Sequence, residues 1–296
     1  MKVLCPAKVN LFLEVTGKRP DGYHRLATLF AKINIYDVLE VEPDPGGTLS
    51  LSVDGGEDIG GPPPEGPDNL AWRAADAFRR ECGIETGVKM KLIKRIPSGA
   101  GLGGGSSDAA GVLSGLARIF KDELPPGAPQ RLRRLGAKLG ADVPFFLSPA
   151  AFCVGTGIGD RLKAFKVNKT LPYMILVYPG FSTSTREVYR NLVIPRRKDV
   201  LTRLSHLDKL VRSLEKGRPS PSWQACLFNR LEESRSPALA QVEAARAVLV
   251  RLGVPGVRMT GSGSCLFGFV GGYEEGERLL SELRRYPWKT FLTSCL

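Results

Sequence analysis

A glycine-rich segment at 97–107, which reads PSGAGLGGGSS, constrains the fold and function of this chain more than any other stretch. Five of the seven residues at 99–105 are glycines, and they lie between a strand-like pattern and a helical pattern. Glycine permits positive φ and close approach of the backbone to a ligand. N–H groups at a helix start bind phosphate oxygens. A serine-capped turn needs only one or two glycines, so the segment predicts a phosphate-binding loop.

Two common phosphate loops do not fit this segment. A Walker A loop ends in Gly-Lys-Ser/Thr, and no lysine occurs at 97–107. A dinucleotide fingerprint G-x-G-x-x-G can be placed at 99–104, but alone it is a weak signal, and no short first strand opens the chain before it. The pair Ser106–Ser107 directly after the glycines also does not belong to that fingerprint.

The rest of the chain mixes strand and helix patterns without strict alternation, which favours an α+β fold over a doubly wound α/β fold. Gly140 is a candidate helix C-cap, and a composition shift at 155–159 suggests a domain junction. We expect strands at 3–15, 49–53, 88–96, 173–178, 257–259 and 265–270, an apolar stretch at 26–41, and helices at 69–80, 107–120, 131–139, 199–217, 223–232, 237–252 and 274–286.

Composition narrows the class of protein. The 296 residues allow one large or two moderate domains. No apolar run approaches the ~20 residues of a membrane span, and the first residues resemble neither a signal nor a transit peptide, so we expect a cytoplasmic protein. Six dispersed cysteines and two histidines favour reduced thiols and no metal site within the chain. The net charge of +12 is concentrated at 186–230 without an aromatic recognition motif, which favours a solvated helical surface over a nucleic-acid groove.

The order P-x-G-x-G-L-G-x-G-S-S resembles the ATP loop of the GHMP kinases, which phosphorylate small alcohols. The segments PAKVNL at 6–11 and TGSGSC at 260–265 extend the resemblance in the family's order. The resemblance implies that ATP binds here, with Mg²⁺ carried mainly by its phosphates. The nucleotide-binding residues that it implies are Pro97, Ser98, Gly99, Ala100, Gly101, Leu102, Gly103, Gly104, Gly105, Ser106, Ser107 and, near adenine, Asn69.

Within the family, KVNLFL at 8–13, DGYH at 21–24 and GADVPFF at 140–146 resemble the branch whose alcohol substrate is CDP-methylerythritol. The resemblance implies phosphorylation of its 2-hydroxyl in the non-mevalonate route to isoprenoids. Aromatic faces would stack on the cytosine base. The implied substrate-binding residues are Asn10, Tyr23, His24, Thr185, Tyr189, Gly261 and Ser262. The chain departs from the pattern at Ser184, where proline is usual, and at Asp160, where glutamate is usual.

Lys8 and Asp142 are the candidate catalytic residues. An alcohol that attacks phosphorus needs a proton acceptor, and a positioned carboxylate can serve. The resemblance implies that Asp142 is this base, although aspartate is also favoured in turns. Lys8 lies within an apolar strand, where it would either face solvent or belong to a site. The resemblance favours the site, where a cation would keep Asp142 ionised and stabilise charge on the transferred group.

The resemblance also implies a two-domain α+β architecture. A βαβ-containing domain like ribosomal-protein domain 2 is expected at 1–155, and a ferredoxin-like domain at 156–296, whose last strand could return to the first domain. The active site is expected in the cleft between them. We expect a monomer or weak homodimer.

Two alternatives stay open. One is a GHMP kinase for another alcohol, such as homoserine or a mevalonate-type acid, which would offer no base for Tyr23, His24 or Tyr189 to stack on. The other is a basic RNA-binding module with the same N-terminal fold, which predicts salt-dependent RNA affinity and no ATP turnover.

Overall fold

The computed structural model describes residues 1–61, 63–168, 170–217 and 221–296, which form two compact units. Neither unit is one continuous stretch. The glycine segment is shared between them, because its residues 99–102 belong to unit 2 and its two ends belong to unit 1. The proposed division between residues 155 and 156 stays a prediction. Unit 1 consists of Met1–Ala7, Ile35–Ser98 and Gly103–Pro149, and unit 2 of Lys8–Asn34, Gly99–Leu102 and Ala150–Leu296.

Unit 1 contains a sheet of order β3-β4-β2-β1, to which two long strands contribute only part of their length. In β4, Met90 is buried while its neighbours Lys89 and Lys91 are exposed, so the alternation predicted for this strand is confirmed. Strand β3 runs parallel to β4, and β2 runs antiparallel to it. The strands are β1 (Lys2–Lys18), β2 (His24–Asp44), β3 (Leu49–Gly55) and β4 (Gly87–Lys94).

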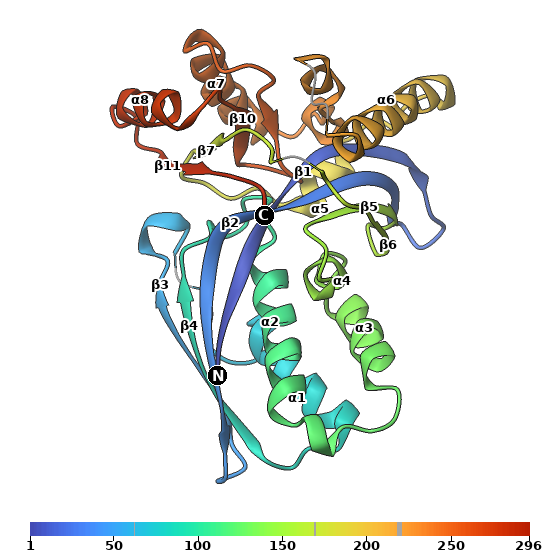
Figure 1. The fold of residues 1–296 in the computed structure, drawn as a ribbon, viewed down its shortest axis with the longest axis vertical. Coiled ribbons are helices and arrows are strands. Elements are labelled where there is room, and N and C mark those ends of the chain that lie inside the picture. The colour runs from blue at the N-terminus through green and yellow to red at the C-terminus, as the bar shows by residue number, and fades with distance from the viewer. Residues whose placement is uncertain (62, 169, 218–220) are drawn as a thin grey trace. The chain divides into compact units, whose positions relative to one another are not determined.

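The helices of unit 1 lie along one side of this sheet (Figure 1). Small residues bring α2 close to the strands: a Cβ added at Gly111 would lie 2.5 Å from Cys5 Sγ. In α1, the buried residues Ala74 and Phe78 recur at helical spacing. The helices are α1 (Leu70–Cys82), α2 (Gly104–Ile119), α3 (Ala128–Leu139) and α4 (Val143–Leu147), with short 3₁₀ turns η1 (Glu57–Ile59) and η2 (Lys121–Glu123).

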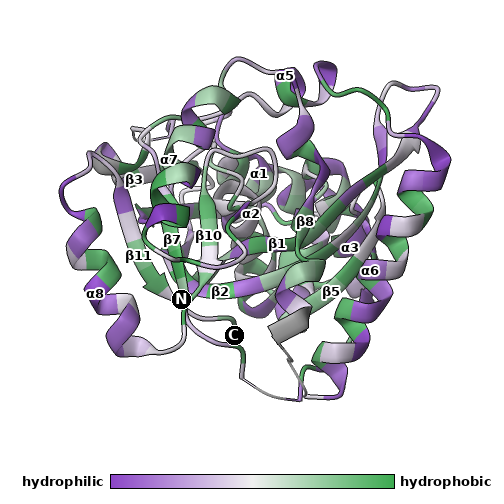
Figure 2. Ribbon diagram, turned by 90° about the horizontal axis from the view of Figure 1, so that it is seen from above, coloured by the Kyte–Doolittle hydropathy of each residue, from purple (hydrophilic) through white to green (hydrophobic). Residues whose placement is uncertain are grey.

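Unit 2 contains an antiparallel sheet of order β11-β7-β10-β9. Strands β7 and β10 are buried and mainly hydrophobic, whereas α8 shows both hydrophobic and hydrophilic residues, as expected for a helix packed on one side of a sheet (Figure 2). The strands are β7 (Met174–Tyr178), β9 (Arg258–Met259), β10 (Leu266–Phe269) and β11 (Lys289–Thr293), and the helices are α5 (Thr185–Arg190), α6 (Arg197–Glu215), α7 (Leu239–Arg251) and α8 (Tyr273–Leu283).

The parts of β1 and β2 that belong to unit 2 have their own partners. Strand β5 (Phe152–Gly157) pairs with β2 and with β6 (Arg161–Ala164), so the residues at 155–159 form a hairpin. Strand β8 (Phe228–Asn229) runs parallel to β1, with Asn229 opposite Leu13. The C-terminal residues also reach β2, because Leu296 N donates to Lys32 O at 3.0 Å.

Most predicted elements are confirmed, and two need correction. The helix predicted at 223–232 is wrong, because the chain there forms the 3₁₀ turn η3 (Pro221–Cys226), the strand β8 and a second 3₁₀ turn, η4 (Arg230–Glu233). Side-chain bonding competes with the helix: Asn229 Oδ1 accepts a hydrogen bond from Leu231 N at 2.9 Å. Helix α2 begins at Gly104 with Gly103 as its N-cap, so Ser106 and Ser107 lie in the first turn and do not cap it.

No helix in the described part of the chain is long and apolar enough to cross a membrane. All six cysteines lie outside disulfides.

Candidate functional site

The first half of the glycine segment is packed tightly within unit 2. Gly101 has φ +79°, and a Cβ added there would lie 2.0 Å from Thr260 O, so no larger residue fits. Three backbone hydrogen bonds hold the stretch: Lys8 N donates to Leu102 O at 3.0 Å, Cys265 N to Ala100 O at 3.2 Å and Thr183 N to Gly99 O at 3.2 Å. Residues 99–102 are therefore bonded to three other segments of unit 2.

The second half of the segment forms the start of α2 in unit 1. The first hydrogen bond into this helix runs from Ser107 N to Gly103 O at 2.9 Å, so the N–H groups of Gly104, Gly105 and Ser106 precede the helical ladder. Ser107 Oγ is buried and has no hydrogen-bond partner within the described residues. N–H groups that precede the helical ladder and an unsatisfied buried hydroxyl suit an anion such as phosphate.

A buried ionic cluster lies at the same end of α2. Lys94 Nζ donates to Asp37 Oδ2 and, at 2.8 Å, to Asp108 Oδ2, and all three side chains are at most 3% exposed. Burial raises the pKa of Asp108 to about 7 despite the opposing effect of Lys94. Burial alone would lower the pKa of Lys94, but Asp108 and Asp37 together raise it. We call Asp37, Lys94 and Asp108 the charge cluster; a Cβ at Gly104 would lie 3.3 Å from Lys94 Nζ.

Lys8 and Asn10, predicted as site residues, lie side by side in the buried part of β1. Lys8 Nζ donates to Asn10 Oδ1 at 2.6 Å and lies 5.7 Å from the centre of the Phe30 ring. Asn10 Nδ2 donates to Thr28 Oγ1 at 2.7 Å, and Asn10 N donates to Thr260 Oγ1 at 3.0 Å. The solvated alternative for Lys8 does not hold, because this residue is only 3% exposed.

The loop 260–265 between β9 and β10 joins Lys8 and Asn10 to the segment of Thr183 and Thr185, in which Thr185 is a predicted substrate-binding residue. Thr183 Oγ1 donates to Ser262 O at 2.9 Å, and the hydroxyls of Thr185 and Ser262 share a hydrogen bond of 2.8 Å. A Cβ at Gly261 would lie 3.3 Å from Lys8 Nζ. The loop therefore contacts the strand that carries Lys8, the first half of the glycine segment and the residues just before α5.

The aromatic residues predicted to bind a base all belong to unit 2. The His24 and Tyr189 rings stack with centroids 5.0 Å apart, whereas Tyr23 is 63% exposed. Partial burial, aided by the positive charge of Lys18, lowers the pKa of His24, so its imidazole is neutral at pH 7. Ser184 Oγ caps α5 by accepting from Glu187 N at 3.3 Å, so this helix begins without the usual proline.

Asp142 and Asn69 begin helices in unit 1. Asp142 is half-buried, precedes α4 and makes no side-chain capping bond to it. Asn69 is buried and caps α1: its Oδ1 accepts from Ala71 N and its Nδ2 donates to Pro64 O, each at 2.9 Å. Asn69 thus acts as a helix N-cap, and its approach to adenine stays a prediction. Asp142 and Lys8 belong to different units, so their pairing also stays a prediction.

Several residues that build this region were not among the predicted site residues, although two of them, Thr183 and Thr260, lie in segments that the sequence analysis had singled out. They are Thr28, Thr183, Asn229, Thr260 and the charge cluster. The sequence offered one signal for some of them, namely a polar residue inside an apolar strand. Thr28 and Asp37 lie in β2, and Lys94 ends β4. The predicted site residues that unit 2 brings together around the loop 260–265 are Lys8, Asn10, Gly99, Ala100, Gly101, Leu102, Thr185, Gly261 and Ser262.

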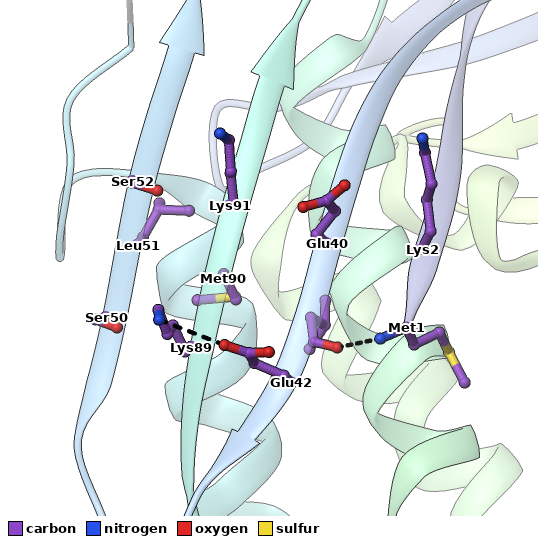
Figure 3. Close-up of a pocket in the computed structure, with 11 residues that line it drawn as sticks. Met1, Lys2, Glu40, Glu42, Ser50, Leu51, Ser52, Lys89, Met90 and Lys91 are labelled. Carbon is purple, nitrogen blue, oxygen red and sulfur yellow. Dashed lines mark hydrogen bonds and ion pairs between the residues drawn. The ribbon is translucent and has the colours of Figure 1, made fainter.

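A hollow of about 560 Å³ in unit 1 contains none of the predicted site residues (Figure 3). Its outer lining is a ladder of charged side chains, including an ion pair of 3.5 Å between Lys89 and Glu42. Oppositely charged neighbours on an exposed strand pair are ordinary for a solvated sheet face. This hollow therefore adds nothing to the candidate site.

Comparison with known proteins identifies the family. Residues 69–149 match the GHMP kinases N terminal domain, and residues 208–288 match the GHMP kinases C terminal domain. The 4-diphosphocytidyl-2-C-methyl-D-erythritol kinase of Geobacter sp. strain M21 is 39% identical, with 90% of this chain and 89% of the relative covered. The enzyme of that name from Thermus thermophilus is 38% identical, with 97% of this chain and 94% of the relative covered.

Comparison with solved structures points to the same family. A crystal structure of 4-(cytidine 5'-diphospho)-2C-methyl-D-erythritol kinase matches with a TM-score of 0.77 and 34% identity, covering 100% of this chain and 99% of that one. Homoserine kinase from Cytophaga hutchinsonii matches with a TM-score of 0.73 at 16% identity, covering 99% of this chain and 94% of that one, which shows a shared fold alone. The chain has the two-domain GHMP kinase fold, and it belongs to the GHMP kinases and, within them, to the 4-diphosphocytidyl-2-C-methyl-D-erythritol kinase family.

Proposed function

We propose that this chain transfers the γ-phosphoryl group of ATP to the 2-hydroxyl of 4-diphosphocytidyl-2-C-methyl-D-erythritol (CDP-methylerythritol), a step of the non-mevalonate route to isopentenyl diphosphate. The observation that carries the proposal is the likeness, along nearly the whole chain, to relatives named for this kinase at 38% and 39% identity. Homoserine and mevalonate kinases share the fold at only 16% identity and give no support for their substrates.

The nucleotide phosphates would bind at the glycine segment. The N–H groups of Gly104, Gly105 and Ser106 supply donors and the positive end of α2. Ser107 Oγ fits a role as a further ligand, because it is buried without a partner in the residues described. No group of three or more His, Cys, Asp or Glu side chains that could hold a metal occurs in the described chain. Mg²⁺ would therefore be held mainly by phosphate oxygens and neutralise their charge.

Asp142 and Lys8 would carry the proton transfer and the charge stabilisation. As the oxygen–phosphorus bond to the acceptor forms, Asp142 accepts the proton of the 2-hydroxyl and ADP leaves. Asp142 suits this role because it places a half-buried carboxylate at the start of α4. Lys8 is buried and held by Asn10, so its ammonium group has a fixed position from which to stabilise the transferred group.

The cytidine end of the acceptor would bind at Tyr23, His24 and Tyr189. Their support is the existing stack of His24 on Tyr189, which provides an aromatic surface in unit 2. The neutral imidazole of His24 can accept a hydrogen bond from an exocyclic amine. The exposed ring of Tyr23 is available for stacking on a base.

We further propose a cytoplasmic enzyme that binds no nucleic acid and is a monomer or weak homodimer. All six cysteines lie outside disulfides, which suits a reducing compartment. Sedimentation would measure the oligomeric state. RNA binding titrated against salt would test the remaining alternative, which predicts steep salt dependence.

The decisive test of the substrate is turnover with ATP and a panel of alcohols: CDP-methylerythritol, homoserine, mevalonate and phosphomevalonate. We expect phosphorylation of CDP-methylerythritol alone, with the product identified by mass spectrometry and by the position of the new phosphate. Phosphorylation of another alcohol with none of CDP-methylerythritol would reject the proposed substrate. No turnover of any alcohol would reject the kinase activity.

The role of Asp142 is tested by Asp142→Asn. We expect kcat to fall by about 10² or more, because the proton acceptor is lost, with little change in nucleotide affinity. Asp76→Asn is the matched control, since Asp76 pairs with the largely exposed Arg80 on the surface of α1. Near-wild-type turnover by Asp142→Asn would remove Asp142 from the mechanism.

A further inference from the structure

Asn229 is a buried amide whose hydrogen-bonding groups are all engaged at one end of the loop 260–265. Its Nδ2 donates to Met259 O at 2.7 Å and to Gly261 O at 2.8 Å, and its Oδ1 accepts from Leu231 N at 2.9 Å. Asn229 is only 1% exposed. Because both donors serve carbonyls on either side of Thr260, the side chain fixes the position of the loop backbone at that point.

The backbone that Asn229 holds is the part of the loop nearest to Lys8. Gly261 has φ +55°, and a Cβ placed on it would lie 3.1 Å from Gly101 O and 3.3 Å from Lys8 Nζ. Thr260, between the two carbonyls, accepts a hydrogen bond from Asn10 N at 3.0 Å. A shift of the loop at Gly261 would therefore change the surroundings of the Lys8 ammonium group directly.

The strand that carries Asn229 has separate anchors. Arg230 makes a bidentate ion pair with the fully buried Glu14, with N–O distances of 2.8 and 2.7 Å. Phe228 packs on Phe12 with ring centroids 5.7 Å apart. These contacts attach β8 and the residue directly after it to β1, the strand of Lys8. Loss of the Asn229 amide would therefore leave β8 in place and release the loop from it.

We propose that Asn229 is a positioning residue that sets Gly261 and Ser262 against Lys8 for phosphoryl transfer, an inference that rests on the proposed kinase function. Misplacement of reacting groups by about 1 Å can cost ~10²-fold in rate. The first half of the glycine segment keeps its own bonds from Lys8 N and Thr183 N when Asn229 is changed. Loss of the amide should thus act on kcat more than on the KM for ATP.

The experiment compares Asn229→Ala with Thr293→Val in the full-length protein. Thr293 is equally buried in unit 2 and donates to Asn34 Oδ1, but it lies on β11, outside the loop and its partners. We expect Asn229→Ala to lower kcat for CDP-methylerythritol at least ~10-fold, with the KM for ATP within threefold of wild type. Thr293→Val should lower Tm while keeping kcat within twofold.

Amide hydrogen exchange gives a second readout that does not depend on turnover. Gly263 N donates to Thr260 O at 3.0 Å inside the loop. In Asn229→Ala this amide should exchange at least ~10-fold faster at a temperature well below Tm, because local opening of the loop no longer breaks two bonds to Asn229. The amides of β10 should keep their wild-type rates.

The outcomes separate the inference from the proposed function. Wild-type protein that phosphorylates no alcohol rejects the function. Wild-type turnover together with unchanged kcat and unchanged Gly263 exchange in Asn229→Ala makes Asn229 merely structural and overturns the inference. If the alanine variant does not fold, Asn229→Ser, which keeps one hydroxyl donor, is measured instead. An intermediate loss of kcat then supports the inference, and wild-type kcat overturns it.

Discussion

The two halves of the glycine segment are held by different chemistry. In unit 1, the start of α2 lies against the charge cluster, in which Lys94 binds the carboxylates of Asp37 and Asp108. In unit 2, residues 99–102 meet a loop held by amides and hydroxyls, chiefly Asn10, Thr260 and Asn229. We call Asn10, Thr28, Thr260 and Asn229 the amide–hydroxyl network.

The charge cluster and the amide–hydroxyl network should differ in how much they contribute to stability and in how that contribution depends on pH. Removing one partner from a buried ion pair leaves an uncompensated charge, at a cost of about 3–5 kcal/mol. Removing one partner from a neutral buried hydrogen bond costs about 1–3 kcal/mol. The charge cluster should therefore be the stronger and more pH-sensitive support of the loop, and the amide–hydroxyl network the weaker and pH-independent one.

Lys94→Met gives the largest expected effect. The variant buries Asp37 and Asp108 next to each other without a cation, and we expect the free energy of unfolding to fall by about 3–5 kcal/mol at pH 8. Urea unfolding followed by circular dichroism measures it. Lys91→Met is the control on the same strand, because Lys91 is half-exposed and pairs with Asp54 on the surface; its loss should be at most about 1 kcal/mol. Equal losses in the two variants would show that the charge cluster contributes no more to the free energy of unfolding than a surface ion pair does.

Thr28→Val tests the amide–hydroxyl network, the weaker of the two supports. Thr28 Oγ1 accepts from Asn10 Nδ2 and donates to Phe12 O, each at 2.7 Å, so valine removes one hydrogen-bond partner from each of these two buried groups. We expect a loss of about 1–3 kcal/mol in the free energy of unfolding, of the same size at pH 6 and pH 8.

The control for Thr28→Val is Thr156→Val on the paired strand β5, where the hydroxyl is exposed and makes only a long bond of 3.4 Å to Arg161 O. It should change stability by less than about 0.5 kcal/mol. A loss in Thr28→Val that changes with pH would show that the amide–hydroxyl network is coupled to a titrating group.

The sequence predicted the parts of this comparison that depend on local pattern. Alternation identified β4, glycine density identified the loop, and Lys8 and Asn10 were placed on one face of β1, as the bond between them requires. The residues that the sequence did not reveal are those whose hydrogen-bond partners lie far away along the chain. Asp37 and Lys94 are 57 residues apart, and Asn10 and Thr260 are 250 apart. No periodicity within one element reveals such partners.

The helix predicted over 223–232 failed for a related reason. Its apolar spacing was compatible with a helix, but Trp223 packs edge-on against Phe269 at 4.7 Å, and Asn229 and Arg230 bond to the loop and to Glu14. Tertiary contacts thus override the local pattern in the stretch that supports the loop 260–265. The start of α2 at Gly104 shows the same limit, because glycine has a poor helix propensity that the packing against Ile96 and Lys94 outweighs.

Asp108→Asn gives the sharpest test of the ionic side, because it changes how stability depends on pH. Because the pKa of Asp108 is raised to about 7, the folded protein holds a proton that the unfolded chain releases near pH 4. Wild-type stability from this group is therefore present below about pH 4 and is lost as pH rises to about 7. The neighbours that face Asp108 are Asp37, Lys94 and Cys5, and the thiol of Cys5 has its own pKa raised by burial, so it stays neutral across this range.

Asparagine cannot titrate, so the difference in unfolding free energy between wild type and Asp108→Asn should fall with pH by up to about 1.4 kcal/mol per unit between pH 4 and 7. Urea unfolding of both proteins at several pH values measures this slope, and Asp76→Asn, on the surface of α1, serves as the control. Parallel curves for wild type and Asp108→Asn would show that the charge cluster holds no extra proton. The contrast between the two supports of the glycine segment would then lie in strength alone, because neither would respond to pH.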